Sequence, residues 1–537
     1  MNMEQTDPQH YQRLLRVAQR ITTQRDVLRL CEVIVEEARV LSGAEGALIY
    51  LLANGAGQPV PRLQCAVLRW PATALCQGGN GYAPVMQPEL LLDAPASPVA
   101  EAARSGEAVT SYQPQQLIGE TREATTRDSL AIPLLDHDQQ VLGVLQLLNV
   151  VESGGATPGG AKSDVAAPVK LGVAKGSTAS EAKALLSGIT SYAATALHNA
   201  LLAQELEQLL DAFIRVIARA IDEKSSHTSG HCQRVPLLTE LIAQAACADT
   251  AVFRDFNLSD DEWYELRVAA WLHDCGKLTT PDSVLDKSTK LHTLHDRIEE
   301  VAARYAVLRA VRQGECAAAT AAEPEAASRY QRALADDLAV LDDELAFLRR
   351  VNKGSECMAE ADQARVREIA LRQWPDVKGR MQPLLSEEEA AALCVVRGTL
   401  THEEREIINN HVQVTLDMLE SLPFPRKLWR VPEYAGGHHE RIDGSGFPRG
   451  LTGEQMSLPA RMLAIADVFE ALTAHDRPYK PPMKISQALS ILKQMRDARH
   501  IDADLYQLFV RERVWETYAR RVLDPAQLDV TDASIFL

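Results

Sequence analysis

The sequence predicts an α+β domain followed by an all-α domain that carries an inserted helical hairpin. Two apolar runs, at 47–54 and 63–70, and a strand–turn–strand pattern at 129–150 predict a sheet in the first third of the chain. After residue 181 the apolar residues recur at helical spacing. A chain of 537 residues exceeds one ordinary core, so two or three domains are expected.

The net charge, the cysteines and the apolar content of the chain argue against some classes of function. The formal net charge of −17 argues against a nucleic-acid scaffold, which would show a basic face. It still allows an anionic substrate, because bound dications can reverse the local field. Nine cysteines without a CxxC pair indicate a reduced, cytoplasmic chain. The N-terminus has no apolar signal region, and no run of eighteen apolar residues is present, so no membrane span is expected.

The first domain is expected to begin with a helix at 10–42 and to close with a helix that starts after a loop. The loop, 152–181, is rich in Gly, Ser, Ala and Pro and is expected to be flexible. This order of helix, strands, hairpin and closing helix resembles a GAF sensor domain, which we place at 1–205. The resemblance implies either an unknown small ligand or a dimerising module without a ligand.

A connecting helix is expected at 206–226, within a helical pattern that runs from about 183 to 222. Its apolar residues form one stripe. A second copy of the chain could pair with that stripe as a coiled coil, which predicts a homodimer, or the stripe could pack on its own domain. The residues of the stripe are Leu202, Leu206, Leu209, Leu210, Phe213, Val216 and Ile217.

A second helical pattern spans about 291–395. Apolar residues step by four and three from Leu294 to Leu308 and again from Leu334 to Leu348, with an alanine-rich segment at 317–328 between them. The pattern predicts an antiparallel helical hairpin with a loose tip. It contains no catalytic pattern, so a structural or partner-docking role is expected.

Histidine and aspartate cluster in otherwise apolar helical segments. His273 and Asp274 end one such segment, Asp467 lies within another, and His438 and His439 precede a glycine-rich turn. Burying a carboxylate there is unfavourable unless a cation or partner satisfies it. Nitrogen and oxygen ligands suit Mn, Fe, Zn or Ni, whereas no cysteine falls in a ligand-like pair.

The joint order of these motifs is more specific than any one of them. HDCGK (273–277), an isolated helical histidine, HHERIDGSGFP (438–448) and IADVFEALTAHDRPYK (465–480) follow one another. Together they resemble the HD-GYP domain of the HD metal-dependent phosphohydrolases, from about 210 to 492, and we place this domain at 227–537. The resemblance implies a helical phosphodiesterase that hydrolyses cyclic di-GMP to pGpG and often on to GMP.

The resemblance also implies roles for single residues. Asp274 would bridge two divalent ions, of which Fe and Mn are the first candidates. Lys277 would contact the scissile phosphate. One ion would be held by His231, His273, Asp274 and Asp467. The other would be held by Asp274, His411, His438 and His439. Arg477 and Lys480 would bind the second phosphate, and the loop residues Gly444, Gly446, Phe447 and Pro448 would line the nucleotide pocket.

Two departures from the family pattern affect the expected chemistry. Phe447 stands where the family has tyrosine, so the ring is kept and the hydroxyl is lost. His227 stands where some members have a glutamate for a third ion, so two ions are expected and a third remains possible. Glu440 and Asp443 are expected to orient ligand imidazoles as hydrogen-bond acceptors, with a surface role for Glu440 as the alternative.

Two other functions compete with the phosphodiesterase. The Phe447 variant could bind cyclic di-GMP with little turnover and act as a receptor or partner-binding module. The site could also act on another nucleotide, such as a hybrid cyclic dinucleotide.

Overall fold

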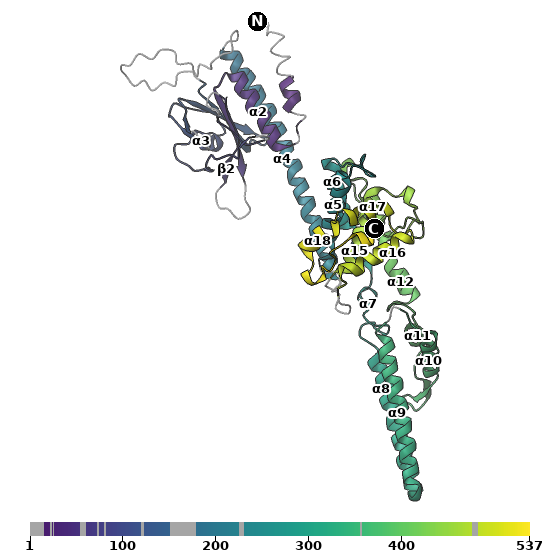
Figure 1. The fold of residues 1–537 in the computed structure, drawn as a ribbon. Coiled ribbons are helices and arrows are strands. Elements are labelled where there is room, and N and C mark those ends of the chain that lie inside the picture. The colour runs from purple at the N-terminus through teal and green to yellow at the C-terminus, as the bar shows by residue number, and fades with distance from the viewer. Residues whose placement is uncertain are drawn as a thin grey trace. The chain divides into compact units, whose positions relative to one another are not determined.

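The structure is a computed structural model, and it divides into two compact units, Met1–Leu210 and Asp211–Leu537 (Figure 1). Among the helices it describes, none is long and apolar enough to cross a membrane. The residues that it describes are 16–21, 24, 26–53, 61–71, 75–79, 82–119, 123–150, 179–224, 230–354, 357–474 and 482–537.

The first unit is built on an antiparallel sheet with the strand order β3-β2-β1-β9-β8-β5, and β4 pairs with β2. A separate pair joins β6 to β7. The predicted strands are all present, as β1, β2, β8 and β9. The strands are β1 (Gly46–Ala53), β2 (Arg62–Trp70), β3 (Leu75–Gln77), β4 (Leu90–Leu91), β5 (Val109–Ser111), β6 (Gln116–Ile118), β7 (Glu123–Thr125), β8 (Ser129–Leu135) and β9 (Val141–Leu148).

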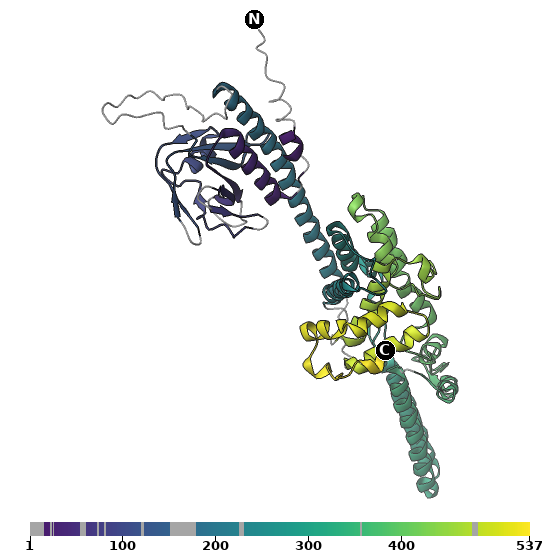
Figure 2. The same cartoon turned by 45° about the horizontal axis from the view of Figure 1, so that its top comes forward.

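Helices cover both faces of this sheet, which explains why its central strands are apolar along most of their length. Along β1, Ala47 and Ile49 face the core shared with α2 (Val27–Ser42) and α4 (Ala179–Lys224). Figures 1 and 2 show these two helices side by side. The alternate residues Leu48 and Tyr50 face α3 (Pro98–Ser105).

Two expectations for this unit need correction. The helix expected at 10–42 is interrupted, because Asp26 caps a new helix by accepting a hydrogen bond from the amide of Arg29 at 2.8 Å. The flexible loop expected at 152–181 lies outside the described residues except for its last three, which belong to α4. The long helix expected from 183 is confirmed within α4.

The second unit is mostly helical. Its main core joins α5 and α15 to the last three helices of the chain. The helices of this core and its surroundings are α5 (His231–Ala248), α6 (Asp260–Leu272), α7 (Asp282–Leu285), α12 (His402–Asn409), α13 (His411–Glu420), α14 (Val431–Gly436), α15 (Leu458–Thr473), α16 (Ile485–Asp497), α17 (Ala503–Arg511) and α18 (Val514–Val522). Short 3-10 turns are η2 (Cys275–Thr279), η4 (Arg426–Leu428), η5 (Gly453–Gln455), η6 (Pro525–Gln527) and η7 (Ser534–Phe536).

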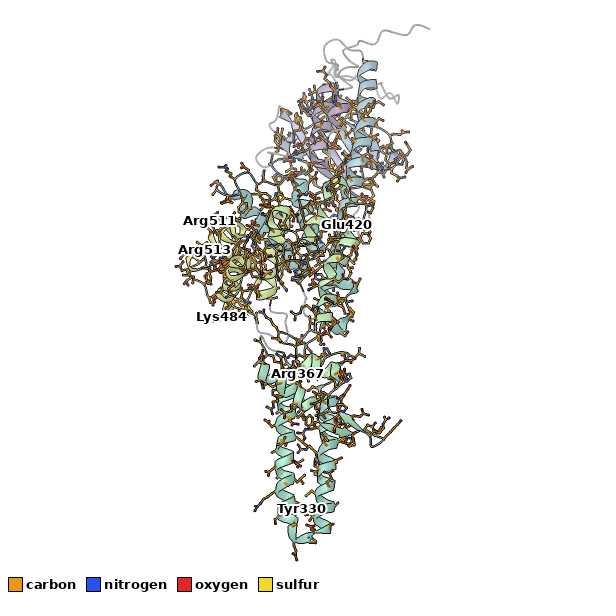
Figure 3. The ribbon with its side chains drawn as sticks, turned by 90° about the vertical axis from the view of Figure 1, so that its right-hand side faces the viewer. Tyr330, Arg367, Glu420, Lys484, Arg511 and Arg513 are labelled. Atoms are coloured by element: carbon orange, nitrogen blue, oxygen red, sulfur yellow. The ribbon has the colours of Figure 1, made fainter. Side chains whose placement is uncertain are left out.

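The inserted helical hairpin is confirmed as α8 (Ile298–Ala322) and α9 (Ala327–Asn352). Figure 3 places Tyr330 near its free end and Arg367 near its base. The loose tip expected at 317–328 is wrong, since only the turn η3 (Pro324–Ala326) interrupts the helices. Leu294, expected in the apolar stripe, precedes α8 and is 95% exposed.

Further elements that the periodicity did not predict pack against the base of the hairpin. They are α10 (Glu360–Ala370), β10 (Gln373–Pro375), β11 (Met381–Pro383) and α11 (Glu387–Leu393). The strand pair β10–β11 is a small exception to the expected all-α character.

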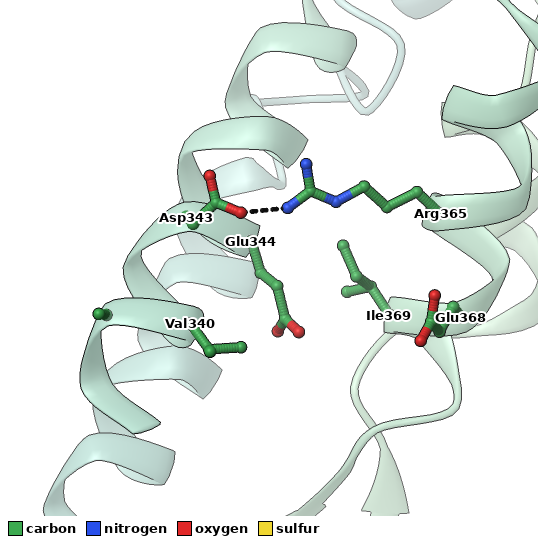
Figure 4. A pocket seen from close by; sticks show the side chains of 7 residues that line it. Val340, Asp343, Glu344, Arg365, Glu368 and Ile369 are labelled. Atoms are coloured by element: carbon green, nitrogen blue, oxygen red, sulfur yellow. Dashed lines mark hydrogen bonds and ion pairs between the residues drawn. The ribbon is translucent and has the colours of Figure 1, made fainter. Parts of the chain in front are cut away.

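A hollow of about 380 Å³ lies between α9 and α10 (Figure 4). Three of its charged lining groups are already paired: Asp343 with Arg365, and Glu344 with Arg372. The hollow therefore belongs to the packing of the insertion.

Glu389 ties the base of the hairpin together from a fully buried position. Its carboxylate accepts hydrogen bonds from Arg297 and Arg304, each at 2.6 Å. It also accepts from the amide of Ser386 at 2.9 Å. Burial raises the pKa of Glu389, but the bonds from Arg304 and Ser386 outweigh burial and lower it below its usual value.

We expect Glu389→Gln to destabilise the insertion by about 2 kcal/mol, because Arg297 and Arg304 lose their buried counter-charge and keep the longer ion pairs with Glu300. The folded pKa is depressed, so this stabilisation is present above the unfolded pKa and is lost as pH falls through the folded pKa. Hydrogen exchange of α8 and α9 across that pH range measures both effects. The exposed neighbour variant Glu388→Gln is the control, and equal exchange in both variants would contradict the prediction.

Candidate metal centre

The ends of several helices bring the candidate ligands together in the second unit. His231 opens α5 and His411 opens α13. His273 and Asp274 lie where α6 passes into η2, and His438 and His439 follow α14. Asp467 lies within α15.

The carboxylate of Asp274 lies between two groups of histidines. Its Oδ2 is 3.3 Å from Nε2 of His231 and 3.3 Å from Nε2 of His273. Its Oδ1 is 3.2 Å from Nε2 of His411 and 3.9 Å from Nε2 of His438. The two oxygens of one buried side chain therefore face two different sets of ring nitrogens.

Each set is completed by a further side chain. Asp467 Oδ1 lies 3.3 Å from Nε2 of His231 and 3.8 Å from Nε2 of His273. His439 offers a ligand atom within 4.8 Å of those of His411 and His438. The residues expected around the two ions thus lie together in two adjoining groups.

Hydrogen bonds fix the orientation of three of these rings in the same way. The Nδ1 atoms of His273, His411 and His438 bond to the carbonyl three residues earlier, at 2.8, 2.6 and 2.5 Å. A carbonyl only accepts, so each Nδ1 carries a proton and each Nε2 is turned toward the centre.

His231 is oriented by a carboxylate instead. Its Nδ1 donates to Glu470 Oε2 at 2.5 Å, and Arg234 donates to the other oxygen of Glu470 at 2.6 Å. The sequence reading did not identify Glu470. The available signal was a second acidic residue in the apolar helix α15, three residues after Asp467.

The polar atoms at the middle of this cluster have no hydrogen-bond partner. Among the described residues, the buried unpaired atoms include Nε2 of His231, His273, His411 and His438 together with Oδ1 of Asp274. Buried polar atoms are rarely left unpaired, and five in one place mark a site for another group. Imidazole nitrogens and carboxylate oxygens that converge in this way fit divalent transition metals.

The electrostatics of the two sets differ. Burial lowers the pKa of His439 to about 4, and burial with the neighbouring His439 ring holds the pKa of His438 well below its usual value. Both rings are therefore neutral at neutral pH and able to coordinate. Burial also acts to lower the pKa of His273, but the adjacent Asp274 outweighs it and raises that pKa to about 9.

Lys277 adds a positive charge to the first set. Its Nζ donates to Asp274 Oδ2 at 2.5 Å. Burial raises the pKa of Asp274, but Lys277 and His273 outweigh burial and hold that pKa well below its usual range. Asp274 is therefore ionised.

Gly276 allows the segment that carries Asp274 to approach α13. A Cβ at this position would lie 2.0 Å from the carbonyl oxygen of His411 and 2.7 Å from the amide nitrogen of Thr415. The Gly276 amide donates to Thr415 Oγ1 at 2.9 Å. The glycine of HDCGK thus brings the two halves of the centre together.

The loop from Gly444 to Pro448 lies against the second set, because the Phe447 ring stacks on His439 with centroids 5.0 Å apart. Gly444 and Gly446 were expected to line the nucleotide pocket. At Gly446 the space of a Cβ is instead taken by this chain's own backbone, 2.4 Å from the Arg441 nitrogen.

Glu440 and Asp443 do not act as expected. Glu440 is buried and accepts from the amides of Arg449 at 2.7 Å and Leu451 at 2.9 Å. Asp443 accepts from the amide and hydroxyl of Ser445. Both carboxylates hold the loop in shape, so the predicted bonds to ligand imidazoles are wrong. Three predicted residues, His227, Arg477 and Lys480, lie outside the described residues.

The last turn of α4 contacts two segments of the centre. Asp222 accepts hydrogen bonds from the amides of Gly230 at 3.1 Å and Cys232 at 3.2 Å, on either side of His231. Lys224 donates to the carbonyl of Leu278 at 2.6 Å, next to Lys277. The end of the connecting helix therefore helps to hold both ligand-bearing segments.

A pocket of about 490 Å³ opens beside His411. Its other lining residues come from the end of η2 and from α12 and the residue after it. They are Thr279, Thr280, Glu403, Glu406, Ile407 and Asn410.

Family models match both units. The GAF domain model matches residues 26–159, and the HD domain model matches residues 387–505. The expected GAF and HD domains are thereby confirmed. Among solved structures, the GAF domain of an Acinetobacter phosphoenolpyruvate-protein phosphotransferase matches at 14% identity, covering 37% of this chain and 99% of that chain. Its TM-score of 0.24 is too low to add to the family match.

Curated relatives are phosphodiesterases of bacterial cyclic dinucleotides. The 3'3'-cGAMP-specific phosphodiesterase 1 of Vibrio cholerae is 46% identical over 15% of this chain and 19% of its own length. The 3'3'-cGAMP-specific phosphodiesterase 3 of the same organism is 25% identical over 53% of this chain and 35% of its own length. A cyclic di-GMP phosphodiesterase of Pseudomonas aeruginosa is 38% identical over 21% of this chain and 26% of its own length. The chain thus spans about a fifth to a third of the length of these relatives.

We expect Glu470→Gln to weaken metal binding about 10- to 100-fold, because the charged acceptor that orients His231 is lost. Equilibrium dialysis against buffered Mn²⁺ or Fe²⁺ measures the affinity. Glu512→Gln, which changes an exposed carboxylate that pairs with Arg511, is the control. Unchanged affinity in Glu470→Gln would show that the bond to His231 does not position the ligand.

Proposed function

We propose that the HD domain is a metal-dependent phosphodiesterase that hydrolyses cyclic di-GMP to pGpG, GMP or both, under control of the GAF domain. One observation supports this most strongly. The two oxygens of Asp274 face two sets of histidine nitrogens that are buried and unpaired. Two dications between these sets would explain both the spacing and the missing partners.

In this proposal, His231, His273 and Asp467 hold one ion, His411, His438 and His439 hold the other, and Asp274 contacts both. Fe or Mn fits the nitrogen and oxygen donors. When bound, a pair of such ions activates water near neutral pH and stabilises charge on phosphoryl oxygens.

The chain's own residues supply the remaining functions. Hydrolysis requires water to attack phosphorus while the 3′ oxygen departs. Lys277 is a partly buried ammonium beside Asp274, where it can neutralise charge on the scissile phosphate. Arg477 and Lys480 are proposed to bind the other phosphate, Arg477 with two donors and Lys480 as a point charge.

The pocket beside His411 supports a guanine-containing substrate. Its volume of about 490 Å³ is in the range of small-molecule sites. Glu403 and Glu406 place two carboxylates on its lining, and carboxylates accept hydrogen bonds only. The N1–H and amino group of guanine are both donors, whereas N1 of adenine is an acceptor. Cyclic di-GMP, in which either base is a guanine, is therefore the first candidate. 3'3'-cGAMP, which has one guanine and appears in the names of three relatives, is the second.

The test is turnover together with metal content in the full-length protein. We expect wild type loaded with Mn²⁺ or Fe²⁺ to convert cyclic di-GMP faster than 3'3'-cGAMP. We expect Asp274→Ala to lose metal and to lose activity more than about 100-fold, because even outer-shell losses cost 10- to 100-fold. Asp255→Asn, at an exposed position, is the matched control.

Binding of cyclic di-GMP without product in the loaded wild type would contradict the enzyme and favour a receptor. Faster turnover of 3'3'-cGAMP would contradict the choice of substrate and leave the reaction class intact.

The apolar stripe on α4 supports a homodimer. Leu202, Leu206, Leu209, Phe213 and Val216 step by four and three residues, which is the spacing of a coiled-coil seam. All five side chains are exposed in the single chain. A second copy would cover them, and the joined helices would lead to the contacts that Asp222 and Lys224 make at the centre.

We expect the double variant Leu206→Asp/Val216→Asp to sediment as a monomer, because two charges would be placed in the seam of each helix. Analytical ultracentrifugation of wild type and variant measures this. The control Glu207→Asp/Arg215→Lys keeps the charge pattern beside the seam. A wild type that is monomeric at high concentration would overturn the dimer.

A further inference from the structure

A cluster of candidate metal ligands also lies in the first unit. Asp136 and His137 belong to the turn between β8 and β9, and His198 belongs to α4. One ligand atom from each lies within 4.8 Å of the others. Among the described residues, two further groups share this property, and they are the two halves of the HD centre.

The carboxylate of Asp136 is held in one orientation. Its Oδ1 accepts hydrogen bonds from the amides of Asp138 at 2.9 Å and Gln140 at 2.8 Å. Its Oδ2 faces Nδ1 of His198 at 3.8 Å. That distance is too long for a hydrogen bond. It lies within the range of 3.2 to 3.9 Å that separates the carboxylate oxygen atoms of Asp274 from the ring nitrogens of the HD centre.

The two imidazoles are arranged like those of the HD centre. The rings of His137 and His198 meet edge to face with centroids 5.2 Å apart. The rings of His411 and His439 have the same separation and the same edge-to-face arrangement. Nε2 of His137 also lies 3.3 Å from Oδ2 of Asp138, which adds a second carboxylate beside the cluster.

The elements that carry these ligands are anchored in the core of the first unit. Leu134, two residues before Asp136, and Leu197, next to His198, are fully buried in the same core. His137 itself is exposed, so an ion can enter from solvent. The site thus combines two fixed ligands with one accessible ligand at the tip of the turn.

We propose that Asp136, His137 and His198 bind a transition-metal dication such as Zn²⁺ or Ni²⁺ and thereby fasten the β8–β9 turn to α4. Two imidazole nitrogens with one carboxylate oxygen suit these borderline cations, whereas Mg²⁺ and Ca²⁺ prefer oxygen ligands throughout. Tetrahedral Zn²⁺ with bonds of about 2.0–2.2 Å separates its ligand atoms by roughly 3.4 Å. Asp136 Oδ2 and His198 Nδ1 lie 3.8 Å apart, and all three ligand atoms lie within 4.8 Å of one another. The remaining position is open to water.

The test measures zinc per chain in the metal-stripped full-length protein after dialysis against buffered micromolar Zn²⁺ with excess Mg²⁺. We expect His137→Ala and His198→Gln each to hold one zinc ion fewer than wild type. His137 is exposed, so its removal does not threaten the fold. His295→Gln removes an exposed histidine that pairs with Glu300, and it should retain the full zinc content.

A second pair of variants distinguishes zinc bound at this site from zinc bound at the HD centre. Asp274→Ala should keep the zinc ion of the first unit, and Asp274→Ala/His137→Ala should lose it. Zinc should raise the thermal unfolding midpoint of the single variant and leave the double variant unchanged, because only a folded site binds the ion. Equal zinc content in wild type, His137→Ala and His198→Gln would overturn the proposal.

Discussion

The buried carboxylate of Asp274 is the constraint around which the second unit is organised. A charged carboxylate without water is stable only if other charges and ligands surround it. Lys277 supplies one charge at 2.5 Å, and His231, His273, His411 and His438 direct ring nitrogens toward the two oxygens. Within the part of the chain that the structure describes, five buried atoms of the cluster have no hydrogen-bond partner, and they are the observation that most directly indicates a cation site.

Some ligand rings of this centre are oriented by nearby backbone, and one is oriented by a residue from another helix. His273, His411 and His438 each bond to a carbonyl three residues earlier, so their own backbone sets the tautomer and the ring direction. His231 instead depends on Glu470 from α15. Its segment is also held by Asp222 at the end of α4. Of the ligand segments, the one at the start of α5 is therefore the most directly connected to the helix that joins the two units.

The sequence predicted the elements that have a clear period. The apolar runs at 47–54 and 63–70 form β1 and β2. Most of the apolar residues spaced by four and three positions lie in α8 and α9. The short strands β3 to β7 were missed, because pairs of two or three residues depend on neighbours in the sheet. The break at Asp26 was missed, because the apolar period continues across the cap. Glu440 was misassigned, because nothing local shows that two amides of its own loop saturate the carboxylate.

The sequence alone indicated candidate metal ligands in the second unit, since histidine and aspartate within apolar helices are explained by few other roles, and the family resemblance completed the predicted set. It also predicted the GAF and HD domains, which the family models confirm. Only the tertiary structure decided which ligands share a neighbourhood. Asp274 and His411 are separated by the whole insertion, and they meet because Gly276 lets η2 pack directly on α13. Donor type is a property of each side chain, whereas the distance between donors arises from helix packing over long separations in the chain.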